Sequence, residues 1–252
     1  MNVKTYNKKL VEDMLREAAE RKRDSVYKKV QTIFAYHSSR IGGNALSLQE
    51  TEELFEHFCE EAELGQLNDQ IKIIGHFKMF DDMLKNYEGT LSARTVQEYY
   101  SDLNGGPAEE QQDDRLDRLF DWFDSLKQPT ISDFARFHAE FDKIHPFEDG
   151  NGRIGRMLLF KECLNRGLMP FIVLSEEKDD YLNAVKEEQK GNSGILEQIF
   201  FREQFRFLEE TEDFVLSVDK YLELDSSLVK SEIETGSAGR ELFEENGSLQ
   251  IK

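Results

Sequence analysis

The chain has 252 residues, enough for one large domain or two small ones. Its 32 lysine and arginine residues are outnumbered by 51 aspartate and glutamate residues, which gives a net charge of −19 at pH 7. So acidic a protein repels nucleic acid and anionic membranes, and we expect neither as a partner. The apolar share is only 38%, but 19 phenylalanines make it bulky enough for one sizeable core.

The N-terminus and the cysteines indicate a cytoplasmic protein. Residues 1–23 are charged from Lys4 onward and contain no apolar segment of the kind found in signal peptides. The longest uncharged apolar stretch, 167–174, is far too short to cross a bilayer. Cys59 and Cys163 lie in apolar helical patterns without neighbouring metal ligands, so we expect both to be reduced thiols.

Helical periodicity dominates the chain, and sustained period-two alternation is hard to find. In chain order, the apolar spacing predicts helices over 7–36, 47–63, 67–86, 92–103, 113–127, 131–144, 153–166, 177–190 and 194–223. All four prolines fall between these segments, where helix breakers belong. The predicted fold class is therefore all-α, a compact helical domain with at most a very short hairpin or an extended piece at 171–174.

Local signals define several boundaries. Ser47 with Glu50 forms a candidate capping box, Thr130 or Ser132 is placed to cap the helix that reaches 144, and Gly167 is suited to end a helix. Residues 104–114 form a polar connector, and 225–252 mix serine, glycine and glutamate in a loosely ordered tail. We divide the chain into an N-terminal helical segment 1–45, a core 46–224 and an acidic tail 225–252.

One stretch, from His145 to Arg156, concentrates residues that carry chemistry. It begins where a helix must stop before Pro146 and ends in a new apolar helix, so Gly150, Asn151 and Gly152 lead into a helix N-terminus. Free backbone N–H groups and the positive end of the helix dipole favour an anion there. Glycines let a phosphate approach the backbone closely.

Four side chains of the same stretch complete the parts for phosphoryl or nucleotidyl transfer. Arg153 and Arg156 lie three apart on one helix face and suit phosphate oxygens. Asp149 is a hard ligand for Mg²⁺, and His145 is a candidate general base. Each residue taken singly also has an ordinary structural explanation, but their convergence within twelve positions favours a site. We interpret the other histidines, at positions 37, 57, 76 and 138, as structural.

This stretch resembles the signature of the Fic family, His-x-Phe-x-(Asp/Glu)-Gly-Asn-Gly-Arg-x-x-Arg, at every fixed position. The resemblance extends over about 33–205 and implies a Fic-type helical domain that transfers AMP from ATP to a hydroxyl side chain of a protein. It implies that His145 is the base, that Asp149 holds Mg²⁺ and that Gly150, Asn151 and Gly152 form the anion hole. By the same resemblance Arg153 contacts the phosphates, Arg156 holds the γ-phosphate, and Tyr181 lies in the adenine pocket.

A second, partial resemblance involves residues 38–44. Family members with an N-terminal inhibitory helix carry (Ser/Thr)-x-x-x-Glu-(Gly/Asn), and here Ser38, Gly43 and Asn44 fit while Gly42 stands where the inhibitory glutamate belongs. The family's glutamate pairs with the second motif arginine, here Arg156, and glycine has no such charge. The resemblance implies autoinhibition relieved at Gly42. The alternative is that 38–44 is only a helix end capped by glycine.

The sequence leaves other points open. The family's hairpin flap, which docks the target, corresponds here to the short and acidic segment 104–114, so the target is not identified. The Ser, Thr or Tyr that is modified is equally open, although self-modification fits the resemblance, and an oligomer is compatible with the sequence. Alternative functions are transfer of UMP, phosphate or phosphocholine by the same fold, or nucleotide sensing without catalysis.

Overall fold

The computed structural model describes residues 2–20, 22, 24–59, 68–107, 113–216 and 231. Within these ranges the chain forms helices and contains no strand, so the predicted all-α class is confirmed. The helices are α1 (Val3–Glu20), α2 (Val26–Ile41), α3 (Leu48–Cys59), α4 (Asn68–Lys85), α5 (Ala93–Asn104), α6 (Asp114–Ser125), α7 (Ile131–Ile144), α8 (Asn151–Arg166), α9 (Lys178–Gln189) and α10 (Ile195–Leu216), with a 3-10 turn η1 (Ser175–Glu177) before α9.

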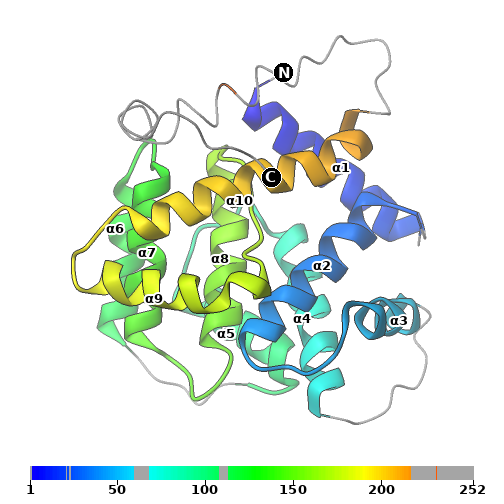
Figure 1. The fold of residues 1–252 in the computed structure, drawn as a ribbon, viewed down its shortest axis with the longest axis horizontal. Helices are drawn as coiled ribbons and strands as arrows, with labels where there is room; N and C mark the ends of the chain where they lie inside the picture. The colour runs from blue at the N-terminus through cyan, green and yellow to red at the C-terminus, as the bar shows by residue number, and fades with distance from the viewer. Residues whose placement is uncertain are drawn as a thin grey trace.

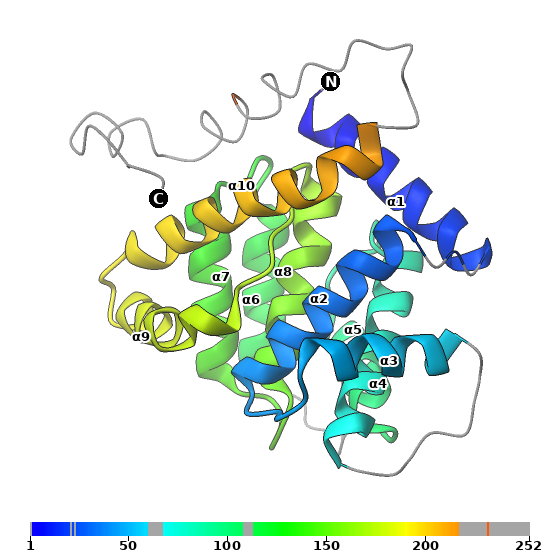
Figure 2. The same ribbon diagram turned by 45° about the vertical axis from the view of Figure 1, so that its right-hand side comes forward.

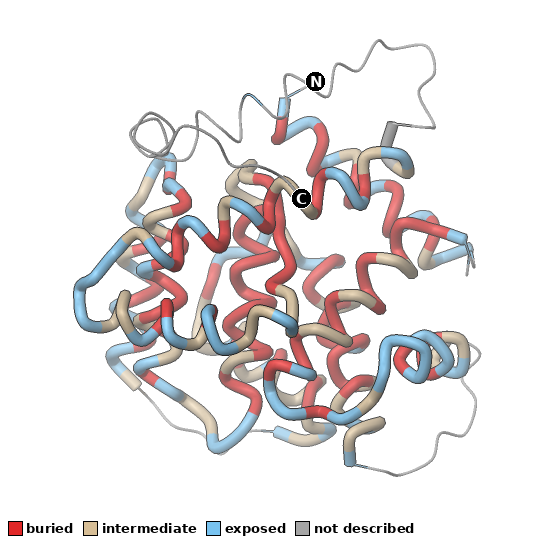
Figure 3. Tube along the Cα trace, in the orientation of Figure 1, coloured by how far each residue is buried: buried red, intermediate tan, exposed pale blue. Residues whose placement is uncertain are grey.

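Helix α8 is the centre of the molecule. Figures 1 and 2 show α6, α7 and α9 on one side of it and α2, α3 and α4 on the other, while α10 crosses one end of the bundle. α8 packs against α7, α4, α2, α1 and α5, and 13 of its 16 residues are buried. Figure 3 likewise shows buried residues along almost the whole of α8. The start of α8 is therefore held by several elements at once.

The N-terminal helices belong to this core. One hydrophobic cluster runs from Val3 to Leu208 and includes Tyr6 and Leu10 of α1 and Phe34 of α2. Asn7 of α1 also donates to the backbone carbonyls of Cys163 and Leu168, at 3.2 and 2.7 Å. Helices α1 and α2, which lie in the predicted N-terminal segment 1–45, thus pack into the same hydrophobic core as the later helices.

The prediction of one helix over 7–36 is wrong, because two helices, α1 and α2, replace it. Ser25 is the N-cap of α2: its backbone is extended and its side chain accepts a hydrogen bond from Lys28 N at 3.1 Å. Glu17 of α1 accepts a hydrogen bond from Tyr27 N at 3.2 Å and pairs with Lys22. These contacts bring the end of α1 against the start of α2 and turn the chain between them.

Other boundaries agree more closely with the sequence. Thr130 caps α7 in a complete capping box with Asp133, and the Ser47–Glu50 box is also formed. Gly167 ends α8 in a left-handed conformation, as predicted. Helix α8 starts at Asn151, two residues before the predicted start. Residues 171–174 form neither helix nor strand.

Some expectations fall outside the described residues. These are the central part of the 104–114 connector, at 108–112, and the tail 225–252 apart from Ser231. Cys163 is buried and free, as expected. In the described ranges, no helix combines the length and the hydropathy needed to cross a membrane.

Candidate active site

The loop between α7 and α8 carries the predicted motif. α7 ends at Ile144, and His145 turns the chain out of the helix with φ 52° and ψ 63°. It is the one residue other than glycine with a positive φ in the described part of the chain. A non-glycine residue in this conformation costs on the order of 1–3 kcal/mol and is frequent at functional sites. The structure thus leaves His145 exposed at the start of the loop, as a general base requires.

Asn151 fixes the shape of the loop. Its Oδ1 accepts a hydrogen bond from Phe147 N at 3.0 Å, and its Nδ2 donates to the carbonyl of Phe147. The Phe147 ring also packs on Tyr100 of α5, with 4.4 Å between the ring centroids. The Asn151 side chain therefore belongs to the internal structure of the loop, and only its backbone N–H remains for the predicted anion hole.

Gly150 begins α8 without a side-chain cap among the described residues. It adopts φ 90°, a left-handed conformation that glycine accepts at little cost. A Cβ at this position would lie 2.9 Å from Leu103 Cδ2, so a larger residue would also collide with the end of α5. Uncapped first-turn N–H groups form an anion site at a helix N-terminus.

Asp149 is surrounded by cationic and N–H groups. Its Oδ1 accepts from Gly150 N at 2.7 Å and pairs with Arg153 Nη2 at 3.0 Å, while its Oδ2 pairs with Lys72 Nζ of α4 at 3.0 Å. Partial burial acts to raise the pKa of Asp149, but Lys72, Arg153 and the Gly150 N–H outweigh it and lower the pKa to about 2. The carboxylate is therefore ionised at neutral pH.

Asp149 is also the residue that would hold Mg²⁺. The described residues contain no group of three or more metal-ligating side chains. A single ionised carboxylate suits Mg²⁺ only when phosphate oxygens and waters complete its coordination, which is how the ion binds in nucleotide sites. The side chain of Asp149 is 57% exposed and so accessible to such a ligand. The donor set fits a metal that arrives with a nucleotide.

Both motif arginines are buried. Arg153 is 4% and Arg156 is 5% exposed. Arg153 Nη1 has no hydrogen-bond partner among the described residues, and burial together with the charge of Arg156 lowers the pKa of Arg153. An unpartnered N–H of a buried guanidinium is costly to leave without an acceptor. The arginine is thus poised to accept an anion with modest local movement.

Arg156 is held by the end of α2. Its Nε donates to Ser38 Oγ at 3.1 Å and its Nη2 to the Ser38 carbonyl at 2.6 Å. The structure thus brings the predicted regulatory segment to the motif, but through Ser38. α2 ends at Ile41, Gly42 is its C-cap, and Gly43 has φ 94°. A Cβ at Gly42 would lie 3.9 Å from the same Ser38 carbonyl oxygen.

Asn44 anchors the segment that follows α2. Its Nδ2 donates to the Asp69 carbonyl at 2.9 Å, and the neighbouring Ala45 N donates to Asp69 Oδ2 at 3.0 Å. Asp69 lies in the first turn of α4, the helix that carries Lys72. The predicted regulatory residues are therefore connected to two residues of the motif. Ser38 contacts Arg156 directly, and Asn44 contacts α4, the helix whose Lys72 pairs with Asp149.

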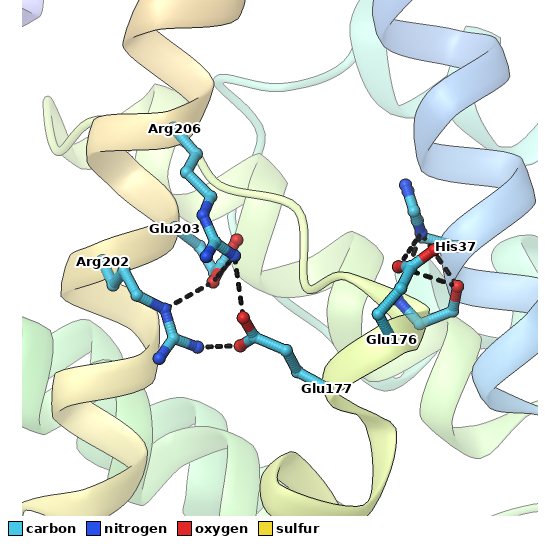
Figure 4. A network of polar contacts seen from close by, with 7 residues as sticks. His37, Glu176, Glu177, Arg202, Glu203 and Arg206 are labelled. Atoms are coloured by element: carbon cyan, nitrogen blue, oxygen red, sulfur yellow. Dashed lines mark hydrogen bonds and ion pairs between the residues drawn. The ribbon is translucent and has the colours of Figure 1, made fainter. Parts of the chain in front are cut away.

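A network around His37 holds the last turns of α2 in place (Figure 4). His37 Nδ1 accepts from Ser175 N at 3.1 Å, which fixes η1 against α2. On the other side of η1, Glu177 pairs with Arg202 and with Arg206 Nη1, the latter at 2.9 Å, and both arginines also bind Glu203 of α10. Ser38, the next residue after His37, is thus presented to Arg156 from a fixed helix.

Tyr181 lies beneath the site and offers no open face for adenine. The side chain is 1% exposed, its hydroxyl bonds with His138 Nε2, and its ring centroid is 5.9 Å from Arg156 Cζ. Burial raises the pKa of Tyr181. This position does not favour the adenine contact that the resemblance implied, because a stacking ring must reach the surface of the pocket. Tyr181 supports Arg156 from below.

Sequence reasoning did not identify three residues beside the motif. Lys72 pairs with Asp149. His76 is fully buried next to Phe34, and neither ring nitrogen has a partner among the described residues. Burial, then the charges of Arg153 and Arg156, lower the pKa of His76 to about 3. Lys72 and His76 are four residues apart and so lie on one face of α4. This spacing was the available sequence signal that the two residues face the same neighbour.

His138 of α7 is the third of these residues. A Cβ at Gly155 would lie 3.1 Å from its Cε1, so the absence of a side chain at Gly155 lets α7 and α8 approach here. Burial and the charge of Arg156 lower the pKa of His138 to about 3. Both buried histidines are therefore neutral at physiological pH and add no charge beside the arginines.

Comparison with known proteins gives a family match over part of the chain. Residues 60–162 match the Fic/DOC family. The protein adenylyltransferase Fic of Nematostella vectensis is 26% identical over 185 residues, which cover 62% of this chain and 43% of that protein. The probable protein adenylyltransferase aq_aa38 of Aquifex aeolicus is 40% identical over 63 residues, 25% of this chain and 19% of that protein. The chain thus spans less than half the length of these curated relatives.

Solved structures share the fold. Fic-1 (aa134–508) from C. elegans superposes with a TM-score of 0.60 at 18% identity, covering 84% of this chain and 73% of that chain. A Fic domain containing signaling protein from Bacteroides thetaiotaomicron gives a TM-score of 0.58 at 20% identity, covering 94% of this chain and 99% of that chain. At these identities the likeness establishes the shared architecture.

Proposed function

We propose that this chain, of which residues 60–162 match the Fic/DOC family, is a protein adenylyltransferase that transfers AMP from ATP to a hydroxyl side chain of a protein, itself included. The observation that carries the proposal is the convergence of an ionised Asp149, the uncapped start of α8 and two buried motif arginines on one loop that begins with an exposed histidine. The relatives named protein adenylyltransferase support it.

In this proposal the phosphates of ATP bind along the start of α8. The N–H groups of the first turn and Arg153 receive phosphate oxygens, and Arg156 contacts the γ-phosphate once it leaves Ser38. Mg²⁺ held by Asp149 supplies positive charge that offsets the charge of the phosphates. Preorganised donors of this kind are the main catalytic resource in phosphoryl and nucleotidyl transfer.

His145 is the general base. Its imidazole takes the proton from the target hydroxyl while that oxygen forms a bond to the α-phosphorus of ATP. The bond between the α-phosphorus and the bridging α–β oxygen breaks, and pyrophosphate leaves. The products are the AMP-modified protein, pyrophosphate and a proton carried by His145. The free thiol of Cys163 suits the cytoplasm, where we place this reaction.

The segment 38–44 is proposed to regulate the site through Arg156. Neutral groups of Ser38 hold the guanidinium, and Gly42 offers it no carboxylate. A hydrogen bond from a guanidinium to a neutral acceptor is weaker than one to a carboxylate, so ATP displaces it more readily. In this proposal the chain is therefore active without a separate activating event.

The test is intact-mass analysis after incubation with ATP and Mg²⁺. We expect the unmodified chain to gain AMP units and His145→Ala to gain them about 10²–10⁴ times more slowly, because that is the usual contribution of a positioned base. ATP binding should be retained, since the imidazole is not part of the phosphate cradle. His57→Ala, an exposed histidine of α3, is the matched control and should react normally.

The position of the label separates the rival functions. AMP transfer moves a label from the α-phosphate of ATP to protein, and phosphate transfer moves one from the γ-phosphate. Transfer of UMP or phosphocholine requires a different donor, such as UTP or CDP-choline. A chain that binds ATP but transfers nothing from any donor would be a nucleotide sensor. Rapid AMP transfer by His145→Ala would contradict the assignment of the base.

A further inference from the structure

Lys72 is the partner of Asp149 that no motif assigns. It lies in the second turn of α4, and its Nζ is 3.0 Å from Asp149 Oδ2. The other oxygen, Oδ1, is engaged by Gly150 N and by Arg153 Nη2. Both oxygens of the carboxylate that would bind a metal therefore already have positively polarised partners within the protein.

The three partners differ in how easily they leave. Gly150 N belongs to the backbone at the start of α8, and the Arg153 side chain is only 5% exposed. The Lys72 side chain is 29% exposed and carries its charge on a flexible four-carbon stem. Of the partners that the structure describes, Lys72 is the one that can withdraw from Asp149 into solvent without moving backbone.

The helix that carries Lys72 is anchored close to it. Asp69, one turn earlier, accepts the N–H of Ala45 at 3.0 Å through its carboxylate and the Asn44 amide at 2.9 Å through its carbonyl. The backbone of the first turn of α4 is thus fixed against the segment that follows α2. This anchoring lets the Lys72 side chain exchange partners from a fixed backbone position.

We propose that Lys72 is an internal counter-ion of Asp149, which pairs with Oδ2 as long as no metal is bound and releases it when a divalent cation arrives with the nucleotide. This inference rests on the proposed function, because ATP is the ligand that brings the cation. Lys72 then sets how strongly nucleotide binding depends on the metal.

The two binding conditions predict effects of opposite sign. Without metal, Lys72 neutralises Asp149 and shields the phosphates from its charge, so loss of Lys72 weakens binding of free ATP. With Mg²⁺, the Lys72–Asp149 ion pair must be broken, so loss of Lys72 strengthens binding of the metal–nucleotide complex. A part-exposed ion pair contributes modestly, which sets the expected change in the ratio of the two affinities at about fivefold.

The experiment is calorimetric binding of α,β-methylene ATP, which cannot release AMP, in excess EDTA and in excess Mg²⁺. The measured quantity is the ratio of Kd without metal to Kd with metal. Lys72→Met should raise the ratio about fivefold, and Lys72→Gln should do the same. Lys78→Met is the matched control: it removes an exposed positive charge from α4, two turns away, and should leave the ratio unchanged.

A double variant tests the link to Asp149. In the Asp149→Asn background the carboxylate charge is gone, so adding Lys72→Met should no longer alter the ratio. Equal weakening of both affinities by Lys72→Met would overturn the inference, since Lys72 would then be a simple phosphate contact. An unchanged ratio with normal binding would also overturn it, and would leave the proposed function standing. Failure of the unmodified chain to bind the analogue would overturn both.

Discussion

At the scale of single residues, Arg156 is the point where α2 meets the motif. Its guanidinium is buried and donates two hydrogen bonds to Ser38, and the Tyr181 ring lies next to it. The position that Gly42 occupies adjoins the same Ser38 carbonyl. A side chain introduced at position 42 would therefore lie close to Arg156, whereas Gly42 itself has no side chain with which to contact the guanidinium.

We predict that Gly42→Glu strongly lowers AMP transfer. Its Cβ would lie 3.9 Å from the Ser38 oxygen that Arg156 already binds, which places the carboxylate within reach of the guanidinium. A carboxylate–guanidinium pair is stronger than the present neutral contacts and would keep Arg156 from the γ-phosphate. The resulting misalignment of ATP can cost about 10²-fold in rate. Initial rates of self-modification by intact mass measure the effect.

Gly42→Ala is the matched control. Gly42 has φ −75°, which any residue adopts, and an added methyl group meets the Ser39 carbonyl oxygen at 3.2 Å and the Ser38 carbonyl oxygen at 3.9 Å. We expect near-normal transfer from this variant because it introduces no charge. Adding Arg156→Ala to Gly42→Glu should not restore activity, since the γ-phosphate contact is then lost as well. A fully active Gly42→Glu variant would show that the 38–44 segment has no inhibitory role.

The motif could be predicted residue by residue, but its neighbours could not. His145, Asp149 and the arginines lie within twelve positions, and the sequence alone displays that spacing. Lys72 and His76 reach the motif only because α4 packs beside α8, a contact between segments far apart in the chain. Tyr181 illustrates a different limit. The resemblance gave its position in the chain but not the direction of its ring, which is buried.

At the scale of elements, the contact between α4 and α5 supports the motif loop. A Cβ at Gly75 of α4 would lie 2.2 Å from the carbonyl oxygen of Leu103 at the end of α5. The two backbones touch here because Gly75 has no side chain. Leu103 in turn lies against Gly150, where α8 begins. The close packing of α4 and α5 thus sets the position of Leu103, and Leu103 in turn limits the position of Gly150 at the start of α8.

We predict that Gly75→Ala destabilises the protein, although alanine has a higher helix propensity than glycine. Alanine in place of glycine inside a helix is favourable by about 0.5–1 kcal/mol. The collision with Leu103 backbone is larger, because overpacking costs about 1–3 kcal/mol and backbone cannot swing aside like a side chain. Urea unfolding should therefore show a net loss of roughly 1–2 kcal/mol in the free energy of unfolding.

Gly106→Ala provides the comparison for this substitution. A Cβ at Gly106 meets no atom within 4 Å in the described structure, so its stability should be nearly unchanged. The Gly75→Ala variant should also bind ATP more weakly, since Leu103 would be pushed toward Gly150. A Gly75→Ala variant as stable as the unmodified chain would mean that α4 and α5 separate at no cost.

Element prediction failed at the break between α1 and α2, where the N-cap residue Ser25 was overlooked. Residues 16–24 are rich in helix formers and gave no signal of a break within the predicted helix over 7–36. The chain nevertheless turns there, because Ser25 caps α2 and Glu17 binds the start of that helix. The other boundaries were accurate where the capping residue was local, as at Thr130, Ser47 and Gly167.

At the scale of the whole molecule, the charge is distributed unevenly. The chain carries a net charge of −19, yet Lys72 and Arg153 both pair with Asp149, and Arg156 follows Arg153 on the same helix. Two fully buried neutral histidines, His76 and His138, fill the space beside these arginines. A protonated imidazole there would add a buried positive charge beside the two arginines, so the packing depends on both rings staying neutral.

This dependence predicts how stability changes with pH. The pKa of His76 is about 3 in the folded protein, against 6.5 for an ordinary histidine, because burial and then Arg153 and Arg156 disfavour the charged ring. Between these values the unfolded chain binds a proton that the folded chain does not. The stabilisation is therefore complete above about pH 6.5 and is lost as pH falls, by about 1.4 kcal/mol per pH unit for one histidine.

We predict that His76→Leu flattens this dependence. Leucine is similar in volume and leaves no buried nitrogen without a partner, so the free energy of unfolding at pH 7.5 should be equal to or above that of the unmodified chain. Urea unfolding from about pH 6 to pH 4 should show a slope smaller by about 1.4 kcal/mol per pH unit in the variant. Carboxyls whose pKa is raised by burial, such as Asp81 and Glu203, act in the opposite direction, but they are common to both chains and cancel in the difference. Parallel curves for the two chains would show that His76 is protonated in the folded protein, and the neutral packing behind the arginines would have to be abandoned.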